Sequence, residues 1–147
     1  MIPSAQAPVV SEDWRFHHLG LATRRLAREA DGWRMFGYVP EGDAFEDHVQ
    51  GVRGNFLSSP GPRLELLEPL PESTVLDGWI DRGIRMYHQA FEVLDIRATL
   101  DSTLVRGAKV VVQPVPAIAF GGRLIAFVML PMMHLVEFID TPPVRRR

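Results

Sequence analysis

Two histidines and two glutamates recur in this sequence at matching places. His18 in WRFHHLGLA and His88 in MYHQAFEVLD are 70 residues apart, and Glu65 in LELLEPL and Glu137 in HLVEFID are 72 apart. Each glutamate follows its histidine by a similar interval, 47 residues in the first half and 49 in the second. Imidazole and carboxylate groups in this number suit one divalent metal ion, such as Co, Ni, Zn, Mn or Fe. The sequence therefore predicts a metal site built from two copies of one unit.

The alternation of side chains along a strand supports this grouping. In the first expected strand, His18 takes one face and His17 the other. In the matching strand of the second half, His88 shares its face with Glu92 and opposes Tyr87. The face that carries the metal-ligand candidates is small and polar, whereas large apolar residues of the other face can pack on helices. We therefore expect His17 to face the helical layer or the sheet edge.

Each candidate also has a purely structural interpretation. A strand histidine is more often a satisfied core or rim residue than a ligand, and Glu65 alone would suit a salt bridge or an edge position. The duplicated register of all four residues favours the metal site. His48 lies in a loop-like stretch and His134 has the wrong parity relative to Glu137, so neither is included.

The elements that must position these residues follow the same order twice. The first half predicts a strand over 14–22, a helix capped by Thr23, a turn-rich stretch over 37–47, and strands over 49–57 and 63–70. A connecting helix follows, capped by Ser73 and ended by Gly83. The second half predicts a strand over 85–93, a helix between Asp95 and Gly107, and strands over 109–115, 123–130 and 134–139. This order predicts an α+β fold of two tandem βαβββ modules.

The expected domain organisation follows from these elements. We expect a flexible N-terminal tail, a single domain of two modules with a connector, and a C-terminal tail, over residues 1–13, 14–141 (modules 14–70 and 85–141, connector 71–84) and 142–147. The two modules would close on one another as a cup-shaped, partly closed mixed sheet, with the histidines and glutamates inside.

Composition narrows the class of protein. The 147 residues are 46 % hydrophobic and 23 % charged, with a net charge of −2, which is typical of a globular domain and does not favour binding to nucleic acid or anionic membranes. The absence of cysteine excludes disulfides, thiolate ligands and a cysteine nucleophile. No apolar run approaches the roughly 20 residues that span a bilayer, and the N-terminus lacks the features of a signal peptide. We expect a cytoplasmic protein.

Four segments of the chain resemble the vicinal oxygen chelate superfamily of glyoxalases, bleomycin resistance proteins and dioxygenases: FHHLGLA, LELLEPL, YHQAFEVLDI and LVEFID. Within it, ELLEPL and VQGV are similar to the methylmalonyl-CoA epimerase family. This resemblance implies paired βαβββ modules around one divalent metal, with His18, Glu65, His88 and Glu137 as the ligands. It also implies a small-molecule substrate such as an acyl-CoA, and a homodimer.

The resemblance also implies an activity. It is that of an epimerase or isomerase, which moves a proton next to a carbonyl through a metal-stabilised enolate, on an acyl thioester such as methylmalonyl-CoA. Glu137 would be a base as well as a ligand, and Glu65 could supply the acid on the opposite face of the enolate if it leaves the metal. The four ligands also resemble those of bacterial glyoxalase I, a lyase, so that activity stays open. So does a metal-free ligand-binding protein of the resistance type. A dioxygenase is less favoured, because its iron site does not require the second glutamate.

Two stretches depart from the epimerase pattern. Gly54, in QGVRGNFL, stands where some epimerases place a second glutamate. The hairpin over 129–133 is apolar where that family has a polar turn, and it carries Met129, Leu130, Met132 and Met133. We expect this hairpin to pack in the core or in a dimer interface. The alternative is that it lines a pocket for a bulky apolar substrate.

Overall fold

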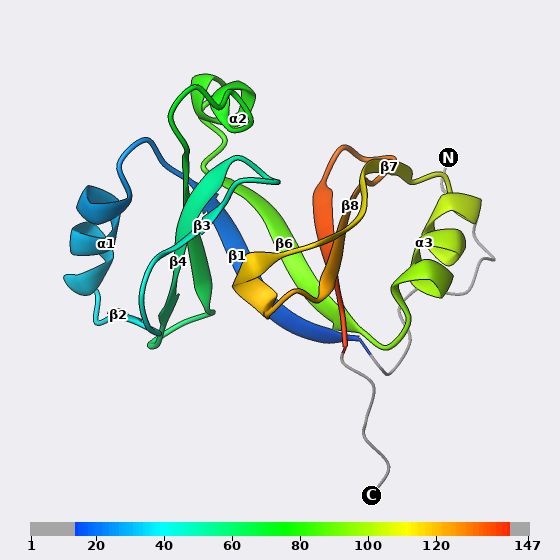
Figure 1. The fold of residues 1–147 in the computed structure, drawn as a ribbon, viewed down its shortest axis with the longest axis horizontal. Coiled ribbons are helices and arrows are strands. Elements are labelled where there is room, and N and C mark those ends of the chain that lie inside the picture. Colours follow the sequence, from blue (N-terminus) through cyan, green and yellow to red (C-terminus); the bar gives the residue numbers. More distant parts are fainter. Residues whose placement is uncertain (1–13, 142–147) are drawn as a thin grey trace, which may run out of the picture.

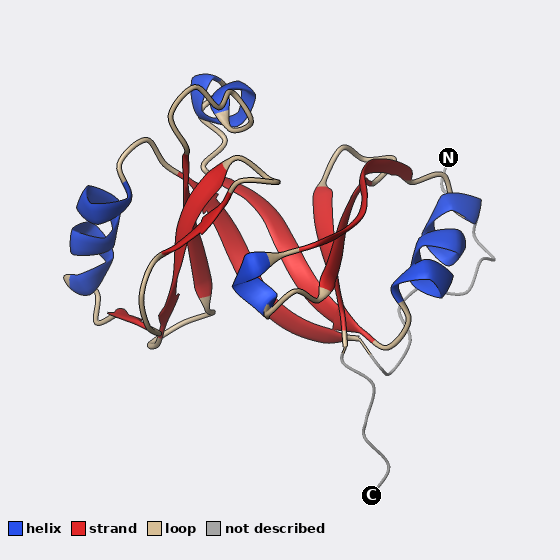
Figure 2. Cartoon of the chain, viewed as in Figure 1, coloured by secondary structure: helices blue, strands red, loops and turns tan. Residues whose placement is uncertain are grey.

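The strands of the molecule form one continuous mixed sheet that is curved and open, with helices outside it (Figure 1, Figure 2). The computed structural model describes residues 14–141, and the two predicted tails lie outside them. Within this part the order is β2-β4-β5-β1-β6-β9-β8-β7, with β3 beside β4. The two ends of this order, β2 and β7, do not pair with each other. The predicted α+β class is confirmed.

Each half of the chain contributes one βαβββ unit, and in the first unit the two short strands β2 and β3, which both pair with β4, take the place of a single strand. The first unit consists of β1 (Arg15–Ala22), α1 (Leu26–Arg34), β2 (Val39–Pro40), β3 (Phe45–Asp47), β4 (Val52–Ser58) and β5 (Leu64–Pro69). The short helix α2 (Asp77–Asp81) connects it to the second unit. That unit consists of β6 (Met86–Val93), α3 (Ile96–Val105), β7 (Lys109–Pro116), the single 3₁₀ turn η1 (Ile118–Phe120), β8 (Leu124–Met129) and β9 (Leu135–Asp140).

The pairing of the strands brings the first and last strands of each unit together. β1 pairs in parallel with β5, and β6 pairs in parallel with β9, while β1 and β6 join the two units as antiparallel neighbours at the centre. Gly20 lies opposite Glu65, and Ala90 lies opposite Glu137. In both units the glutamate is therefore opposite the residue two positions after the histidine, which places both side chains on one face of the sheet.

Helices α1 and α3 cover the outer face at opposite ends of the sheet (Figure 1). Helix α1 packs through Leu26 and Ala30 against β4 and β5, and α3 packs through Ile96 and Leu100 against β8 and β9. A third apolar cluster, which includes Phe120 and Phe127, lies on the inner side of β6, β8 and β9. The inner face is thus left to aromatic residues and to the predicted site.

The helix α1 begins differently from the sequence prediction. Thr23 is not its cap, because the helix begins at Leu26 and the Thr23 hydroxyl accepts a hydrogen bond from the Arg25 amide, 3.3 Å away. The Leu26 amide instead donates to the Glu68 carboxylate at the end of β5, at 2.7 Å. This amide would otherwise be one of the unsatisfied donors at a helix start.

Helix α3 has both a local cap and the same long-range contact. Asp95 is the predicted cap, and its carboxylate accepts a hydrogen bond from the Ala98 amide at 3.0 Å. The Ile96 amide donates to the Asp140 carboxylate at the end of β9, at 3.1 Å. In each unit, a carboxylate at the end of the last strand therefore holds the first amide of the helix.

Two further details differ from the prediction. The stretch 37–47 is not only a turn: β2 and β3 pair with β4 on either side of Gly42. Ser73 does not cap a helix, because α2 begins at Asp77 and the serine hydroxyl accepts from the Val75 amide at 3.4 Å. Within the described residues, no helix is both long and apolar enough to cross a membrane.

Candidate metal centre

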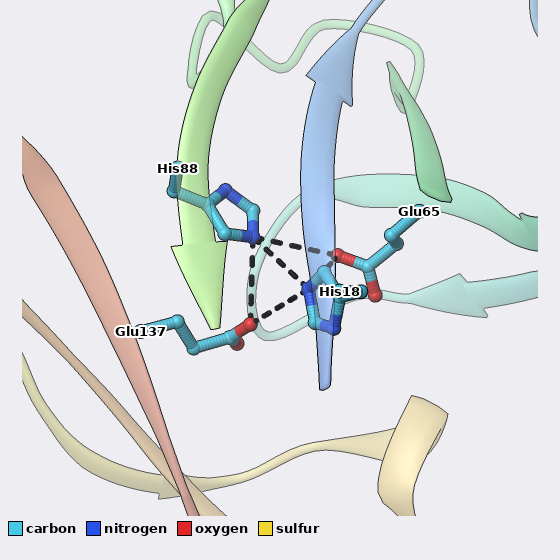
Figure 3. A group of neighbouring side chains, drawn as sticks. All are labelled: His18, Glu65, His88 and Glu137. Atoms are coloured by element: carbon cyan, nitrogen blue, oxygen red, sulfur yellow. Dashed lines mark hydrogen bonds and ion pairs between the residues drawn. The ribbon is translucent and has the colours of Figure 1, made fainter. Parts of the chain in front are cut away.

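The four residues that the repeat pattern groups meet on the inner side of the two central strands (Figure 3). They come from the first and last strands of each unit: His18 from β1, Glu65 from β5, His88 from β6 and Glu137 from β9. One potential ligand atom from each residue lies within 4.8 Å of all the others. All four side chains are buried. The structure therefore brings together every predicted ligand.

Both imidazoles present Nε2 to the cluster. His18 Nε2 lies 3.2 Å from His88 Nε2, 3.3 Å from Glu65 Oε1 and 3.2 Å from Glu137 Oε1. His88 Nε2 lies 3.4 Å from Glu137 Oε1 and 3.8 Å from Glu65 Oε1. A nitrogen from each unit and an oxygen from each unit thus surround one point.

The electrostatics of the cluster follow from its burial and composition. Burial by itself lowers the pKa of His18, but the adjacent Glu65 and Glu137 carboxylates outweigh it and raise the pKa to about 9. Burial raises the pKa of Glu137, yet its contacts with His18 and His88 outweigh burial and bring the pKa well below its usual range. Without an ion, the cluster therefore holds a proton on imidazole and a charge on carboxylate.

The donor set fits a divalent ion. Two nitrogens that bind one zinc ion at ~2.0–2.1 Å in tetrahedral geometry lie roughly 3.4 Å apart, and the two Nε2 atoms here lie 3.2 Å apart. Glu137 Oε1 is buried and makes no well-aligned hydrogen bond among the described residues, although His18 Nε2 and His88 Nε2 lie 3.2 and 3.4 Å away. Buried polar atoms normally have a partner, and an ion at the centre of the cluster would supply one. The group is therefore able to bind a metal.

Two β-bulges interrupt the regular alternation of side chains that the sequence predicts. On β1, Phe16 and His18 pair with two consecutive residues of β6, so His17 is an extra residue. The prediction that His17 faces the helical layer or the sheet edge is wrong, because its ring lies on the same side of the sheet as the candidate metal site. Its Nδ1 is 2.8 Å from His18 Nδ1, and its ring packs against Phe56 and Phe120 at 5.7 and 5.3 Å.

The second bulge lies before the second histidine. On β6, Met86 and His88 pair with two consecutive residues of β1, which makes Tyr87 the extra residue. Its ring stands edge-on to that of His88, with centroids 4.5 Å apart. Burial, followed by the nearby Glu65 and Glu137 charges, raises the pKa of Tyr87, so the phenol keeps its proton. The sequence analysis places Tyr87 on the face opposite His88, because it assumes that side chains alternate regularly along the strand.

A cavity of about 360 Å³ opens above the cluster. Glu65 and Glu137 are among its lining residues, whereas the two histidines are not. Most of the lining is apolar or aromatic, including Trp79, Phe120 and Phe127, and Tyr87 contributes a phenol. The carboxylates thus face the space that a small molecule would occupy, and the imidazoles lie behind them.

Comparison with known proteins agrees with this geometry. Residues 17–127 match the profile of the glyoxalase/bleomycin resistance protein/dioxygenase superfamily. The chain belongs to this superfamily.

Relatives within the superfamily include epimerases. The ethylmalonyl-CoA/methylmalonyl-CoA epimerase of Cereibacter sphaeroides is 28 % identical over 115 residues, which cover 77 % of this chain and 86 % of that protein. A structure of methylmalonyl-CoA epimerase in complex with methylmalonyl-CoA and NH₄⁺ is 26 % identical, with a TM-score of 0.71 over 90 % of this chain and 98 % of the other. A protein of Bacillus halodurans C-125 shares the fold at 24 % identity, with a TM-score of 0.76 over 92 % of this chain and 100 % of the other.

Position 54 lies in a closely packed part of the cavity wall. A Cβ atom on Gly54 would lie 2.6 Å from Phe45 Cζ and 2.7 Å from Leu67 Cδ2, closer than real Cβ contacts allow. The Phe45 ring and Leu67 therefore occupy the space that a side chain at position 54 would need, and both residues line the cavity. A glutamate at position 54 would require Phe45 to move.

The Met-rich hairpin over 129–133 and the turn at Gly121 and Gly122 each contribute neighbouring residues to the cavity wall. Met129 lines the cavity, and Leu130 packs against the core cluster next to α3. Met132 and Met133 are exposed at the turn. Ala119 and Phe120, which precede the two glycines of AFGGR, also line the cavity. The hairpin over 129–133 therefore contributes to the core and to the pocket at different residues.

Proposed function

We propose that this protein is a metal-dependent isomerase or epimerase that moves a proton at the carbon next to a carbonyl, and that its substrate is an acyl thioester such as methylmalonyl-CoA. In this proposal His18, Glu65, His88 and Glu137 hold one divalent ion. The bound ion would supply a Lewis acid for the carbonyl oxygen, on which negative charge develops as the proton leaves. The observation that carries the proposal is the exposure of both glutamates, one from each unit, to a single apolar cavity.

The two carboxylates suit the two proton transfers of an epimerase. Glu65 and Glu137 come from β5 and β9, which lie on opposite sides of the central pair β1 and β6. Their ligand oxygens lie within 4.8 Å of each other, so Glu65 must leave the ion before a planar enolate can have one carboxylate toward each face. Either carboxylate can then take a proton from one face, while the other returns a proton to the opposite face. Position 54 cannot provide this second group, because it is a glycine covered by Phe45.

The lining of the cavity supports the enolate chemistry. Its aromatic and aliphatic side chains limit the access of water, which strengthens electrostatic interactions inside the site. Tyr87, held in its protonated form, is a hydrogen-bond donor in this lining. An acyl group fits a cavity of about 360 Å³, whereas the much larger nucleotide part of a coenzyme A would stay outside it.

Metal analysis and isotope exchange test this function together. We expect near-stoichiometric divalent metal in the purified protein, and metal-dependent exchange of the α-proton of methylmalonyl-CoA or ethylmalonyl-CoA with deuterated water, followed by NMR. Glu137→Gln and Glu65→Gln each keep an oxygen for the ion and remove one base. Each variant should lose epimerisation but still exchange the one enantiomer whose proton faces the remaining carboxylate. No metal and no exchange in the wild type would instead support the metal-free binding protein.

The glyoxalase-type lyase is the second candidate. It is favoured by the lack of a base at position 54, where Phe45 leaves no room for a side chain. A thiol–aldehyde adduct is converted by moving a proton between neighbouring carbons, which does not need a base on each face. Consumption of the adduct of a thiol with methylglyoxal, without exchange on acyl-CoA substrates, would select the lyase. In that case one of the two glutamine variants should abolish turnover and the other should only reduce it.

A further inference from the structure

The nitrogen on the far side of His18 has an unusual neighbour. Because His18 Nε2 faces the metal cluster, its Nδ1 faces away from it, and this atom lies 2.8 Å from His17 Nδ1. Such a distance between two nitrogens is a hydrogen bond, so one nitrogen must carry a proton and the other a lone pair. The bulge at His17 creates the contact, since in a regular strand consecutive side chains point to opposite faces.

The chemistry of metal binding decides the direction of this hydrogen bond. An imidazole that binds an ion through Nε2 carries its remaining proton on Nδ1. His18 is therefore the donor, and His17 accepts at Nδ1. The proton of a neutral His17 ring is then on Nε2, which lies 3.8 Å from Glu92 Oε1. Glu92 is itself 3.3 Å from Arg123, which ties the carboxylate in place.

The second histidine ligand, His88, has no such neighbour at its outer nitrogen. Its Nδ1 is buried and has no hydrogen-bond partner among the described residues. Tyr87 is the extra residue of the second bulge. Its ring packs edge-to-face with the His88 ring and places no acceptor at His88 Nδ1. Only the first unit therefore supplies a nitrogen acceptor through its bulge.

We propose that His17 is a positioning residue for the metal centre: it accepts the Nδ1 proton of His18 and holds that ring with Nε2 toward the ion, while Glu92 favours the tautomer of His17 that can do so. This inference rests on the metal site of the proposed function. Partners of this kind fix the orientation of a ligand histidine and raise its basicity, and their loss typically costs about 10- to 100-fold in metal affinity or activity.

The hydrogen-bond direction can be measured on the wild-type protein loaded with Zn²⁺, whose filled d shell leaves the NMR signals of the rings undisturbed. Long-range proton–nitrogen NMR spectra of the histidine rings report which nitrogen carries the proton. We expect His17 to be neutral, with its proton on Nε2 and a hydrogen-bonded lone pair on Nδ1. A His17 ring with its proton on Nδ1, or with both nitrogens protonated, would overturn the inference.

Variants of His17 test the consequence for the ion. His17→Leu removes the acceptor at similar size, and we expect about 10- to 100-fold weaker Co²⁺ affinity in competition with a chromogenic chelator, together with an altered visible spectrum of the bound Co²⁺. His17→Asn offers an oxygen near the position of Nδ1 and should recover most of the affinity and the spectrum. His48→Leu is the matched control, because His48 is exposed and pairs only with Glu46 among the described residues.

The outcomes separate this inference from the proposed function. Wild-type affinity and spectrum in His17→Leu would overturn it, as would a His17→Asn protein that is as defective as His17→Leu, since the effect would then come from packing. Thermal unfolding of the metal-free variants identifies a folding defect. If His17→Leu does not fold, Glu92→Gln keeps both rings and should still weaken Co²⁺ binding. A wild-type protein that binds no ion contradicts the proposed function and this inference with it, whereas equal ion binding by wild type and His17→Leu contradicts this inference alone.

Discussion

Gly20 is the residue on which the position of His88 depends most directly. A Cβ atom at position 20 would overlap the ring atoms of His88, so the glycine provides the space in which that ring lies. We predict that Gly20→Ala forces His88 away from the cluster and weakens metal binding at least tenfold, the effect of a misplaced ligand. Chelator competition measures the affinity.

The backbone at Gly20 is not in the left-handed region, so an alanine there adds little strain of its own. Gly32→Ala is a suitable control, because a Cβ atom at that exposed position of α1 meets nothing within 4 Å. The control should raise the free energy of unfolding by up to about 1 kcal/mol, as expected for glycine to alanine within a helix. Unchanged metal affinity in Gly20→Ala would contradict the placement of His88.

The raised pKa of His18 makes metal binding dependent on pH. Without an ion, burial opposes the charge on the ring, but Glu65 and Glu137 raise its pKa to about 9, so the ring is protonated at pH 7. An ion can bind only the deprotonated nitrogen. We predict the release of about one proton per ion bound at pH 7, falling toward zero above pH 9. Calorimetry in two buffers of different ionisation enthalpy measures this number.

The same shift has a consequence for the stability of the metal-free protein. The folded pKa of His18 lies above the unfolded value of 6.5. Its contribution to stability is therefore fully present below pH 6.5 and is lost as the pH rises through about 9. Urea unfolding of the metal-free protein across this range should show the decline, and a flat profile in the His18→Asn variant would assign it to this residue.

At the scale of elements, the ends of β5 and β9 hold the starts of the two helices. Glu68 accepts from the first amide of α1, and Asp140 accepts from the first amide of α3. We predict that Glu68→Ala and Asp140→Ala each lower the free energy of unfolding by about 1 kcal/mol, the usual loss for a helix cap. Thr23→Ala should have a smaller effect, because Thr23 does not cap α1. Equal losses from Glu68→Ala and Thr23→Ala would contradict this difference.

Some of these elements could be predicted from the sequence, because they depend on local patterns. The alternation of residues in β1 and β6 and the repeated spacing of His18, Glu65, His88 and Glu137 were enough to group the four side chains. The bulges at His17 and Tyr87 could not be predicted, since an extra residue leaves no mark on residue types. The contact of Glu68 with Leu26 joins residues 42 apart in the chain, so only the Asp95 cap, a local one, was predictable.

Contacts between side chains also limited the prediction of the site. The residues at 129–133 look uniformly apolar, yet Met129 lines the cavity while Met132 and Met133 are exposed. Likewise, the sequence shows a glycine at position 54 but not the Phe45 ring that covers it. The strand that contains Phe45 is three residues long and follows Gly42, so the sequence pattern predicts a turn there instead of a strand.

At the scale of the whole molecule, the candidate centre joins the two units. Each unit supplies one histidine and one glutamate, and the strands β1 and β6 that meet at the centre come from different units. An ion bound only by the folded protein should stabilise both units together, by about 2.7 kcal/mol at a free concentration 100 times its dissociation constant.

We therefore predict that added Co²⁺ or Zn²⁺ raises the thermal midpoint while unfolding remains a single transition. Calorimetry of the wild type and of His88→Ala tests this. Two separate transitions, or the same upward shift in His88→Ala, would show that the ion stabilises the protein elsewhere than at the shared centre.

The two bulges differ in one respect that bears on stereochemistry. If the two units were identical, a half-turn would exchange them, and the two glutamates would have the same surroundings. A histidine precedes the first ligand and a tyrosine precedes the second, so the half-turn symmetry is lost next to the ligands. Glu65 and Glu137 therefore have different surroundings, and the proton transfers on the two faces of a bound intermediate can differ in rate.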